Sequence, residues 1–262
     1  MSPKVSIITV VFNSVKQIED TIKSVLEQSY PNLEYIIIDG GSTDGSKEYI
    51  EQYSDKLDYW VSEKDGGIYN AMNKGILRAK GEYCLFLNSG DHLLDKNSLL
   101  KFEINKNTLY DIIYADIQVV NQFTGNYIKK CPDFLKFSFF VFNTLPHQST
   151  VIRKTLFDSN LYNEELKIVS DWEHFMLSVI KYNATYMHIP EVISVYNEDG
   201  ISAKMGDLLW REKDERLEKY FPMFIDDYKQ MKRGQELQKN LKLSRAIKLL
   251  KKIGLLKNIH IE

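Results

Sequence analysis

The sequence predicts an α/β fold, with a Rossmann-like, mostly parallel sheet covered by helices on both faces and a C-terminal helical extension. Within about the first ninety residues, four apolar runs of strand length alternate with three segments whose apolar residues recur at helical spacing. Each of these runs also ends in a loop rich in Asp, Asn or Gly. Three successive strand–helix–strand steps imply right-handed crossovers and parallel strands.

The first half carries a local signature for each element. Val5–Val11 is a β-branched run typical of a buried strand, and Asn13 and Ser14 follow it as candidate helix caps. The elements expected next are a helix marked by Ile18, Ile22, Val25 and Leu26, a strand Leu33–Asp39, a helix opened by Asp44, Gly45 and Ser46, a strand Asp58–Ser62, a helix Ile68–Ala79 and a strand Tyr83–Leu87.

The second half is less regular. Asp111–Val120 and Asn126–Lys130 have the pattern of a hairpin around Gly125, and a helix is expected over Asp171–Tyr182. Two further apolar stretches, Phe134–Phe142 and Ser149–Arg153, have no assigned element. After about residue 205 the sequence becomes charged and helical in pattern to its end.

Composition excludes several classes of protein. The 262 residues are 44% hydrophobic and 27% charged, which is typical of a globular chain, and no apolar run approaches the roughly 18 residues of a membrane-spanning helix. The start has one Lys before its apolar stretch and no small-residue cleavage site, so we expect no signal peptide. Cys84 and Cys131 stand alone without metal-like spacing, which favours a reducing, cytoplasmic location. A net charge of −2 argues against nucleic-acid binding.

The loops after the four strands are the expected ligand-binding region, because open parallel sheets bind ligands beyond the carboxyl ends of their strands. Asp39 ends the second strand, and it either binds a ligand or caps the turn that follows. Asp91 ends the fourth loop and has the same two interpretations. One carboxylate there suffices for Mg²⁺ if a substrate diphosphate supplies the other oxygens. The four loops expected to bind the ligand are Thr9–Asn13, Asp39–Asp44, Glu63–Gly67 and Asn88–Asp91.

Four motifs, in the order TVVFN, IIIDGGSTDGS, SEKDGGIYNAMNKGI and GEYCLFLNSGD, resemble the inverting family-2 glycosyltransferases of the bacterial surface-polysaccharide type. The resemblance covers roughly residues 4 to 205 and implies the GT-A fold. It implies a catalytic domain over 1–205, in which 1–100 is the nucleotide-sugar-binding half and 101–205 the acceptor-binding half. Residues 206–262 are then a helical, basic, amphipathic extension.

The resemblance also implies roles for individual residues. Asp91 matches the position that reaches a metal, Mg²⁺ or Mn²⁺, although the family's motif usually holds two or three acidic residues. Gly90 replaces the neighbouring acid, so we expect weak metal affinity. In the second motif Gly40 replaces a commoner Asp, and neither departure removes Asp39. The positions matching the nucleotide-sugar site are Thr9, Val11, Asn13, Asp39, Asp65, Asn73, Ser89 and Gly90.

The catalytic base is expected in the second half. Inverting transfer requires a carboxylate that takes the proton of the acceptor hydroxyl, and Asp171 in IVSDWEHFML matches the family's motif. Asp171 is alternatively a helix N-cap. His147, in a His-Gln pair similar to that of a subset of the family, and Trp172 are assigned to the acceptor side. His92 either supplements the metal site or is an ordinary loop residue.

The end of the chain differs in charge from the rest. Residues 229–262 carry a net charge of +8, which leaves −10 for residues 1–228. Leu243, Ile247, Leu250 and Ile253 follow helical spacing, and basic residues gather on another face. Such a helix suits an anionic membrane surface, here through residues 229–257. The alternative is a helix packed on the catalytic domain.

Together these observations predict a metal-assisted hexosyltransferase. We expect a UDP-hexose donor, such as UDP-Gal or UDP-Glc, and a sugar hydroxyl on a lipid-diphosphate-linked acceptor, as in O-antigen or capsule assembly. The location expected is cytoplasmic, peripheral on the inner face of the membrane. Two alternatives stay open, a nucleotidyltransferase and a non-catalytic nucleotide-sugar-binding protein.

Overall fold

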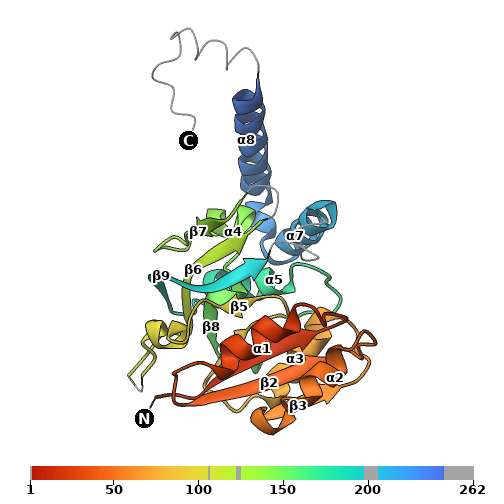
Figure 1. The fold of residues 1–262 in the computed structure, drawn as a ribbon. Helices are drawn as coiled ribbons and strands as arrows, with labels where there is room; N and C mark the ends of the chain where they lie inside the picture. The colour runs from red at the N-terminus through yellow and green to blue at the C-terminus, as the bar shows by residue number, and fades with distance from the viewer. Residues whose placement is uncertain (1, 106, 122–124, 198–205, 245–262) are drawn as a thin grey trace. The chain divides into compact units, whose positions relative to one another are not determined.

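The computed structural model describes residues 2–105, 107–121, 125–197 and 206–244 (Figure 1). The chain packs as two compact units, Met1–Glu212 and Lys213–Glu262. The domain boundary predicted at 205/206 adjoins residues outside the described ranges and stays a prediction.

A single mixed sheet runs through the first unit in the order β3-β2-β1-β4-β8-β6-β9-β5, with β7 paired to β6 (Figure 1). β1, β2, β3 and β4 are mutually parallel, as the alternating pattern predicts. β8 is antiparallel to both β4 and β6, and β9 is parallel to β6. The strands are β1 Val5–Val11, β2 Leu33–Asp39, β3 Tyr59–Ser62, β4 Tyr83–Phe86, β5 His92–Leu93, β6 Ile112–Val120, β7 Tyr127–Lys129, β8 Thr150–Arg153 and β9 Tyr186–Asn197.

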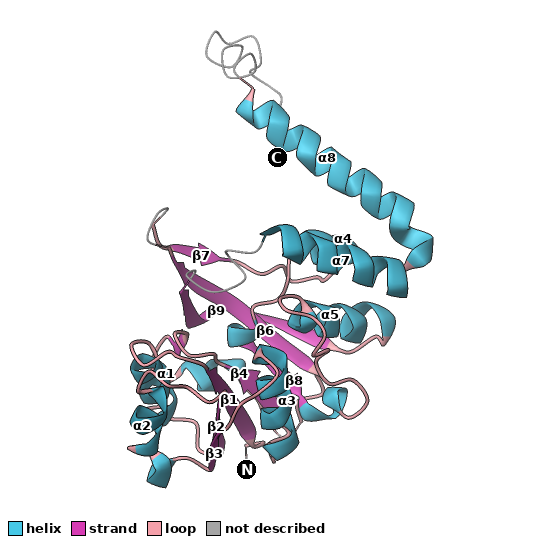
Figure 2. Cartoon of the chain, turned by 90° about the vertical axis from the view of Figure 1, so that its right-hand side faces the viewer, coloured by secondary structure: helices cyan, strands magenta, loops and turns pink. Residues whose placement is uncertain are grey.

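Helices cover both faces of the parallel part of the sheet. α1 (Ile18–Leu26) and α2 (Ser46–Glu51) lie on one face, and α3 (Ile68–Arg78) lies on the other (Figure 2). α3 approaches β1 closely at Gly75, where an added Cβ would stand 2.4 Å from Cγ2 of Ile8. A side chain at this position would push α3 away from the sheet.

The longest strand, β9, was not predicted from the sequence. Its pairing with β6 shifts register near Pro190, because Ala115 pairs with Ile189 while Asp116 pairs with Val192. Pro cannot donate a ladder hydrogen bond and is tolerated in a sheet at such a bulge. The predicted hairpin of β6 and β7 is confirmed.

The remaining helical elements join these strands. Of the two apolar stretches without an assigned element, Phe134–Phe142 contains α4 (Phe137–Phe142) and Ser149–Arg153 contains β8. The helix expected over Asp171–Tyr182 is α5 (Ser170–Met176), continued by one π-helical turn, η5 (Leu177–Lys181). Both cysteines are free and buried. The 3₁₀ segments are η1 Ser54–Lys56, η2 Ser98–Phe102, η3 His147–Ser149, η4 Lys154–Phe157 and η6 Pro222–Phe224.

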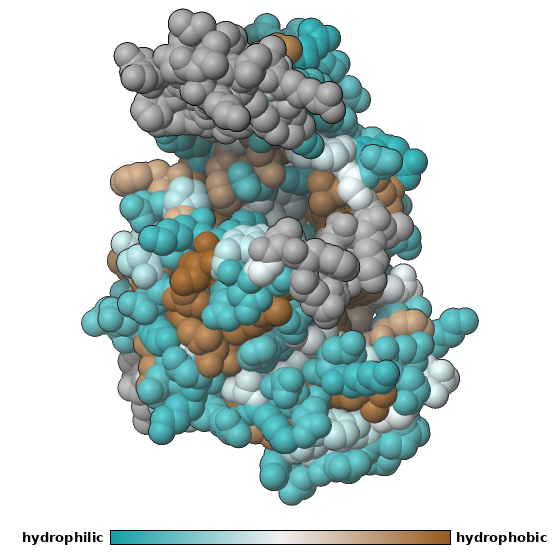
Figure 3. Space-filling model, turned by 45° about the horizontal axis from the view of Figure 1, so that its top comes forward, coloured by the Kyte–Doolittle hydropathy of each residue, from teal (hydrophilic) through white to brown (hydrophobic). Residues whose placement is uncertain are grey.

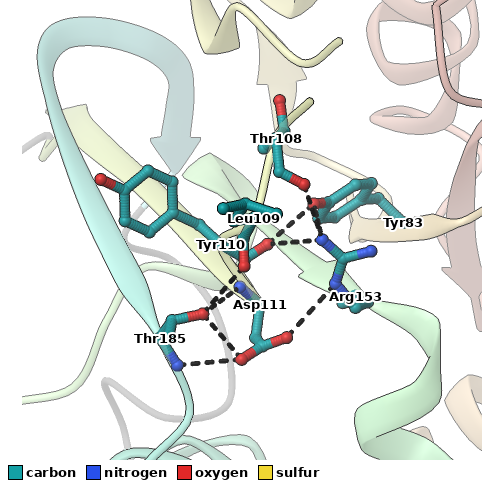
Figure 4. A network of polar contacts seen from close by, with 7 residues as sticks. All are labelled: Tyr83, Thr108, Leu109, Tyr110, Asp111, Arg153 and Thr185. Carbon is teal, nitrogen blue, oxygen red and sulfur yellow. Dashed lines mark hydrogen bonds and ion pairs between the residues drawn. The ribbon is translucent and has the colours of Figure 1, made fainter. Parts of the chain in front are cut away.

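A polar network around Arg153 ties the start of β4 to the end of β8 (Figure 4). The guanidinium of Arg153 donates to the hydroxyl of Tyr83 at 2.7 Å and to the carbonyls of Thr108 and Tyr110, and its Nε lies 3.2 Å from Oδ1 of Asp111. Thr185 donates to the other oxygen of Asp111. This network holds the amino end of β4, opposite the strand ends that carry the site.

The second unit contains most of α7 (Gly206–Tyr220) and α8 (Ile225–Leu243). Asp214 accepts hydrogen bonds from Tyr228 and from Nζ of Lys232. The amphipathic pattern predicted around Ile247, Leu250 and Ile253 lies outside the described residues. Among the helices that are described, none is both long and apolar enough to cross a membrane. The surface in Figure 3 is mostly hydrophilic, with apolar side chains gathered in patches.

Candidate active site

The carboxyl ends of the first three strands bring Val11, Asp39 and Ser62 side by side, since these residues are register partners. Asp39 is fully buried and both of its oxygens accept hydrogen bonds. Oδ2 accepts from the backbone N–H of Ser42 at 3.0 Å and from Oγ of Ser62 at 2.6 Å, and Oδ1 accepts from Oγ of Ser42 at 2.5 Å. Asp39 therefore caps the turn after β2. Its predicted role in binding the nucleotide base stays a prediction.

The loop after β1 is fastened to the loop after β2. Asn13 has a left-handed backbone, with φ of 48°, and its Oδ1 accepts from the N–H of Thr43 at 2.9 Å. Its own N–H donates to Oγ of Ser42. Thr9 is fully buried, with its hydroxyl 3.1 Å from the hydroxyl of Tyr35, and Val11 is 3% exposed. Thr9 and Val11 are thus buried within β1, whereas Asn13, in the loop that follows, is exposed.

Gly40 explains one departure from the family pattern. A Cβ at Gly40 would lie 2.6 Å from Oδ2 of Asp65, whose Oδ1 accepts from the N–H of Gly67, just before α3, at 2.9 Å. The absence of a side chain at position 40 therefore makes room for the Asp65 carboxylate. Asp39 stands at the end of β2 and Asp65 on the loop that follows the paired strand β3, and their predicted part in a nucleotide site stays a prediction.

Asn73, predicted to bind the nucleotide, is engaged within the protein. Its Nδ2 donates to the carbonyl of Tyr162 and to Oε1 of Glu164, both at 2.8 Å, and its Oδ1 accepts from the N–H of Tyr162 at 3.0 Å. Asn70, one turn earlier, donates to the other oxygen of Glu164. These hydrogen bonds join α3 to the loop of residues 162–164, which leads to α5.

Asp171 lies in the first turn of α5 and is 9% exposed. Oδ1 accepts from the hydroxyl of Tyr69 at 3.1 Å, and Oδ2 lies 3.2 Å from Nδ1 of His147. Burial alone would raise the pKa of Asp171, but the hydrogen bond and charge of His147, the N–H of Trp172 and the Tyr69 hydroxyl together lower it below its ordinary value. Asp171 is therefore an ionised carboxylate at neutral pH.

Asp91 is the second buried carboxylate of the site. It is 6% exposed, and its Oδ2 accepts from Nε2 of Gln148 at 3.1 Å. Burial raises its pKa to about 6, although the charge of His147 and the hydrogen bond from Gln148 oppose the rise. A cation or a diphosphate-bound cation beside Asp91 would favour its ionised form.

The adjacent residues His147 and Gln148 connect the two carboxylates. They lie in η3, directly before β8, and β8 runs antiparallel to β4 so that its start meets the end of β4. His147 contacts Asp171 on one side and Asn88 on the other, with Nε2 of the ring 3.3 Å from Nδ2 of Asn88. The structure thus brings the predicted base, the predicted metal ligand and the predicted acceptor-side His147 into one cluster.

The loop between β4 and β5 is held by α1 and β9. The N–H of Gly90 donates to Oγ1 of Thr21 at 3.0 Å, and its carbonyl accepts from Nδ2 of Asn197 at 2.5 Å. The N–H of Ser89 donates to the carbonyl of Val10, which places Ser89 beyond the end of β1. His92 is half-buried with Nδ1 unpartnered within the described chain, and burial lowers its pKa.

Trp172, assigned to the acceptor side, is 1% exposed and its indole N–H donates to the carbonyl of Phe140 at 2.6 Å. His174 is stacked on Phe157 at 4.3 Å, and burial lowers its pKa to about 4, so it is neutral. Tyr162 packs edge-on against Phe86, Phe157 and His174. The rings of Phe86, Phe157 and Tyr162 thus form an apolar layer that packs against His174 of α5.

The oxygen donors fit one hard divalent cation shared with a diphosphate. Mg²⁺ usually binds one or two protein carboxylates and takes its other ligands from substrate and water. Asp91 offers one carboxylate oxygen that Gln148 does not use. No group of three His, Cys, Asp or Glu side chains within the described ranges could hold a metal alone. Such a cation therefore depends on the substrate for its remaining ligands.

Asn88 and Gln148 fall in segments that the sequence analysis singled out, the loop Asn88–Asp91 and the His-Gln pair, but their contacts with His147 and Asp91 were not predicted. Tyr69 lies in the third motif, and the contact of its hydroxyl with Asp171 was likewise not predicted. Glu164 was missed, and no local signal marks it, because it meets Asn73 across 91 residues.

Comparison with known proteins gives a consistent result. A family model described as glycosyl transferase family 2 matches residues 6–158. A Bacillus subtilis protein named as a teichuronic acid biosynthesis glycosyltransferase, TuaG, is 44% identical over 93 residues, which cover 34% of this chain and 36% of that protein. The chain thus aligns with about a third of the length of such curated relatives.

Solved structures share the fold. S. aureus TarS 1–349 in complex with UDP-GlcNAc superposes with a TM-score of 0.64 at 19% identity, covering 93% of this chain and 74% of that one. The mannosyltransferase PcManGT from Pyrobaculum calidifontis, in complex with GDP-Man and Mn²⁺, gives a TM-score of 0.61 at 15% identity, covering 86% and 65%. The predicted GT-A architecture is confirmed at the level of fold.

Proposed function

Because this chain belongs to glycosyl transferase family 2, we propose that it transfers a hexose, with inversion, from a UDP-hexose such as UDP-Gal or UDP-Glc to a sugar hydroxyl. The observation that carries this proposal is the buried, ionised Asp171. It lies in one cluster with Asp91 at the end of the sheet where Asp39 and Asp65 stand. A solved protein of similar fold binds UDP-GlcNAc, which supports a UDP-sugar donor here.

Asp171 acts as the general base in this proposal. Its carboxylate takes the proton of the acceptor hydroxyl as that oxygen attacks the anomeric carbon and the bond to the diphosphate oxygen breaks. The hydroxyl of Tyr69 and Nδ1 of His147 fix the two carboxylate oxygens, so the remaining lone pairs are oriented before the acceptor arrives. The apolar layer around Tyr162 excludes water behind the base.

Asp91 would hold Mg²⁺ or Mn²⁺ against the donor diphosphate. When bound, the cation supplies electrostatic stabilisation of the negative charge that develops on the leaving nucleoside diphosphate. Gln148 orients the Asp91 carboxylate by donating to Oδ2. The nucleotide itself would lie along the loops of Asn13, Asp39 and Asp65, with Ser89 and Gly90 beside the sugar phosphate.

The acceptor that we propose is a lipid-diphosphate-linked sugar used in bacterial surface-polysaccharide assembly, such as O-antigen or capsule. The similarity to a protein named for teichuronic acid biosynthesis supports this class. The basic residues of 229–257 suit an anionic membrane surface, which would bring the chain to such an acceptor on the cytoplasmic side.

The test is transfer by purified protein. A panel of UDP-hexoses with Mn²⁺ and a lipid-diphosphate sugar acceptor is expected to yield a product with inverted anomeric configuration by NMR. Asp171→Asn removes the base without changing its size, and kcat should fall by about 10²- to 10⁴-fold while UDP affinity stays within about twofold. Unchanged turnover in Asp171→Asn would refute the base assignment. Formation of a UDP-sugar and pyrophosphate from UTP and a sugar 1-phosphate, without transfer from any UDP-hexose, would favour a nucleotidyltransferase.

A further inference from the structure

His147 contacts groups of different chemistry on its two ring nitrogens. Nδ1 lies 3.2 Å from a carboxylate oxygen of Asp171, and that oxygen is an acceptor when ionised. Nε2 lies 3.3 Å from Nδ2 of Asn88, an amide nitrogen that donates. A neutral imidazole has one donor and one acceptor nitrogen, so these neighbours select the ring with its proton on Nδ1.

The surroundings leave His147 as the group that sets the charge environment of Asp171. The other titratable side chains facing Asp171 are Tyr69, Tyr162 and His174. Burial raises the pKa of both tyrosines well above the ordinary value and lowers the pKa of His174 to about 4, so all three are neutral near pH 7. On its other side, His147 faces the buried Asp91.

We propose that Asn88, His147 and Asp171 form a positioning chain, in which Asn88 fixes the tautomer of His147 and the Nδ1–H of His147 orients the catalytic carboxylate. This inference rests on the proposed function, and it names two positioning residues for the reaction. Asn88 lies just beyond β4, and His147 just before β8, so the pairing of these strands sets the geometry of the chain. The same turn holds Asp91 through Gln148, so the base and the cation ligand are oriented together.

The chain also makes Asp171 a base that works at lower pH. Loss of the Nδ1–H donor would leave burial less opposed and raise the pKa of Asp171. Because the reaction needs ionised Asp171, the acid limb of the kcat profile would then move to higher pH when it is measured at saturating donor and Mn²⁺, where the cation keeps Asp91 ionised. A role confined to packing would change stability or substrate affinity without moving this limb.

The experiment compares pH profiles of transfer by His147→Leu, His147→Asn and Asn88→Leu. His147→Leu should lower kcat by about 10- to 100-fold, leave the donor KM within about twofold and move the acid limb to higher pH. In His147→Asn, the amide nitrogen stands near the place of Nδ1 and should restore kcat at least severalfold. Asn88→Leu should shift both quantities in the same direction as His147→Leu, but less.

A matched control and a measurement on the wild type separate the outcomes. His188→Leu breaks another histidine contact with carboxylates, those of Asp116 and Asp133, and should leave the acid limb in place. Long-range ¹H–¹⁵N spectra of the wild-type ring of His147 should show the Nδ1–H tautomer at pH 8. An Nε2–H tautomer there, or an unmoved acid limb in a folded His147→Leu protein that binds UDP, would overturn the inference. A wild type that transfers no sugar would instead overturn the proposed function.

Discussion

At the scale of single residues, Asp91 and Asp171 show how two buried carboxylates acquire opposite properties. Both lose hydration, but Asp171 accepts side-chain hydrogen bonds on both oxygens, whereas Asp91 accepts from Gln148 and from the backbone of Asn197, and these do not offset its burial. The pKa of Asp171 is therefore lowered and that of Asp91 is raised to about 6. An Asp171 that is ionised at neutral pH suits the proposed base, and Asp91 suits a ligand whose charge a bound cation would stabilise.

Asp91→Asn should stabilise the protein in the absence of cation and nucleotide. Because the folded pKa of Asp91 is raised from 3.8 to about 6, the wild type loses stability as pH rises through this window, by up to about 3 kcal/mol. The amide has no such loss, so its advantage in urea unfolding should grow from pH 4 to pH 7.5. Binding of Mn²⁺ with UDP should weaken in the same variant.

Asp95→Asn is the matched control for Asp91→Asn. The hydrogen bond from Lys101 lowers the pKa of Asp95, so its ionised form stabilises the folded state above that pKa. The Asp95→Asn protein should therefore have a lower free energy of unfolding than the wild type at pH 7.5. An equal effect of both substitutions would mean that burial of the Asp91 charge is not the cause.

At the scale of elements, α3 links the two halves of the site. Its first turn follows Asp65, its Tyr69 contacts Asp171, the proposed base, and its Asn73 holds the loop that precedes α5. A single helix thus relates the proposed nucleotide loops to Asp171. The close packing of α3 against β1 at Gly75 therefore determines where these three contacts lie relative to the sheet.

Asn73→Ala distinguishes holding of the loop from binding of the nucleotide. If Asn73 acts through the 162–164 loop, kcat should fall about 10-fold or more by displacement of Asp171, while the Kd for UDP stays within about twofold. Asn70→Ala, which removes one donor to Glu164, should have a smaller effect in the same direction. A rise in the Kd for UDP with unchanged kcat would instead support the nucleotide role predicted from the sequence. Calorimetry and steady-state kinetics measure the two quantities.

Arg153→Met should reduce stability without reducing kcat, because the Arg153 network lies at the strand ends away from the site. The substitution removes three hydrogen bonds from the guanidinium and leaves Asp111 without that cation, a cost of about 2 kcal/mol in urea unfolding. Lys101→Met breaks a more exposed ion pair with Asp95 and should cost below about 1 kcal/mol. Equal costs would show that the network adds nothing to a surface pair.

Elements also show where sequence analysis succeeds. The bounds of β1 and β2 follow from unbroken apolar runs that end in polar residues, which is typical of central parallel strands. β9 was not predicted because His188, Pro190 and Glu191 interrupt the alternation of apolar and polar residues, and because its partner β6 precedes it by about seventy residues. The positions Asp91, His147 and Asp171 were named from motifs, but their mutual contacts depend on strand pairing and have no local sequence signal.

At the scale of the whole chain, the charge division between residues 1–228 and 229–262 predicts membrane association. Full-length protein should sediment with anionic phosphatidylserine vesicles and bind less as salt rises, because screening weakens the attraction of the basic segment. A 1–228 chain, which lacks the +8 segment, should stay in the supernatant. Neutral phosphatidylcholine vesicles are the control. Equal binding of both chains to anionic vesicles would contradict the prediction.

The continuous sheet of the first unit has a mechanical consequence. β4 and β8 exchange ladder hydrogen bonds in register, and they join the parallel strands β1–β3 to β6 and β9. The sheet therefore has no hinge between β4, which precedes the loop of Asp91, and β8, which follows the turn of His147, since separating these strands would break a row of buried backbone hydrogen bonds. Under the proposed function, substrate would enter and product would leave through movements of loops and side chains and not through opening of the sheet.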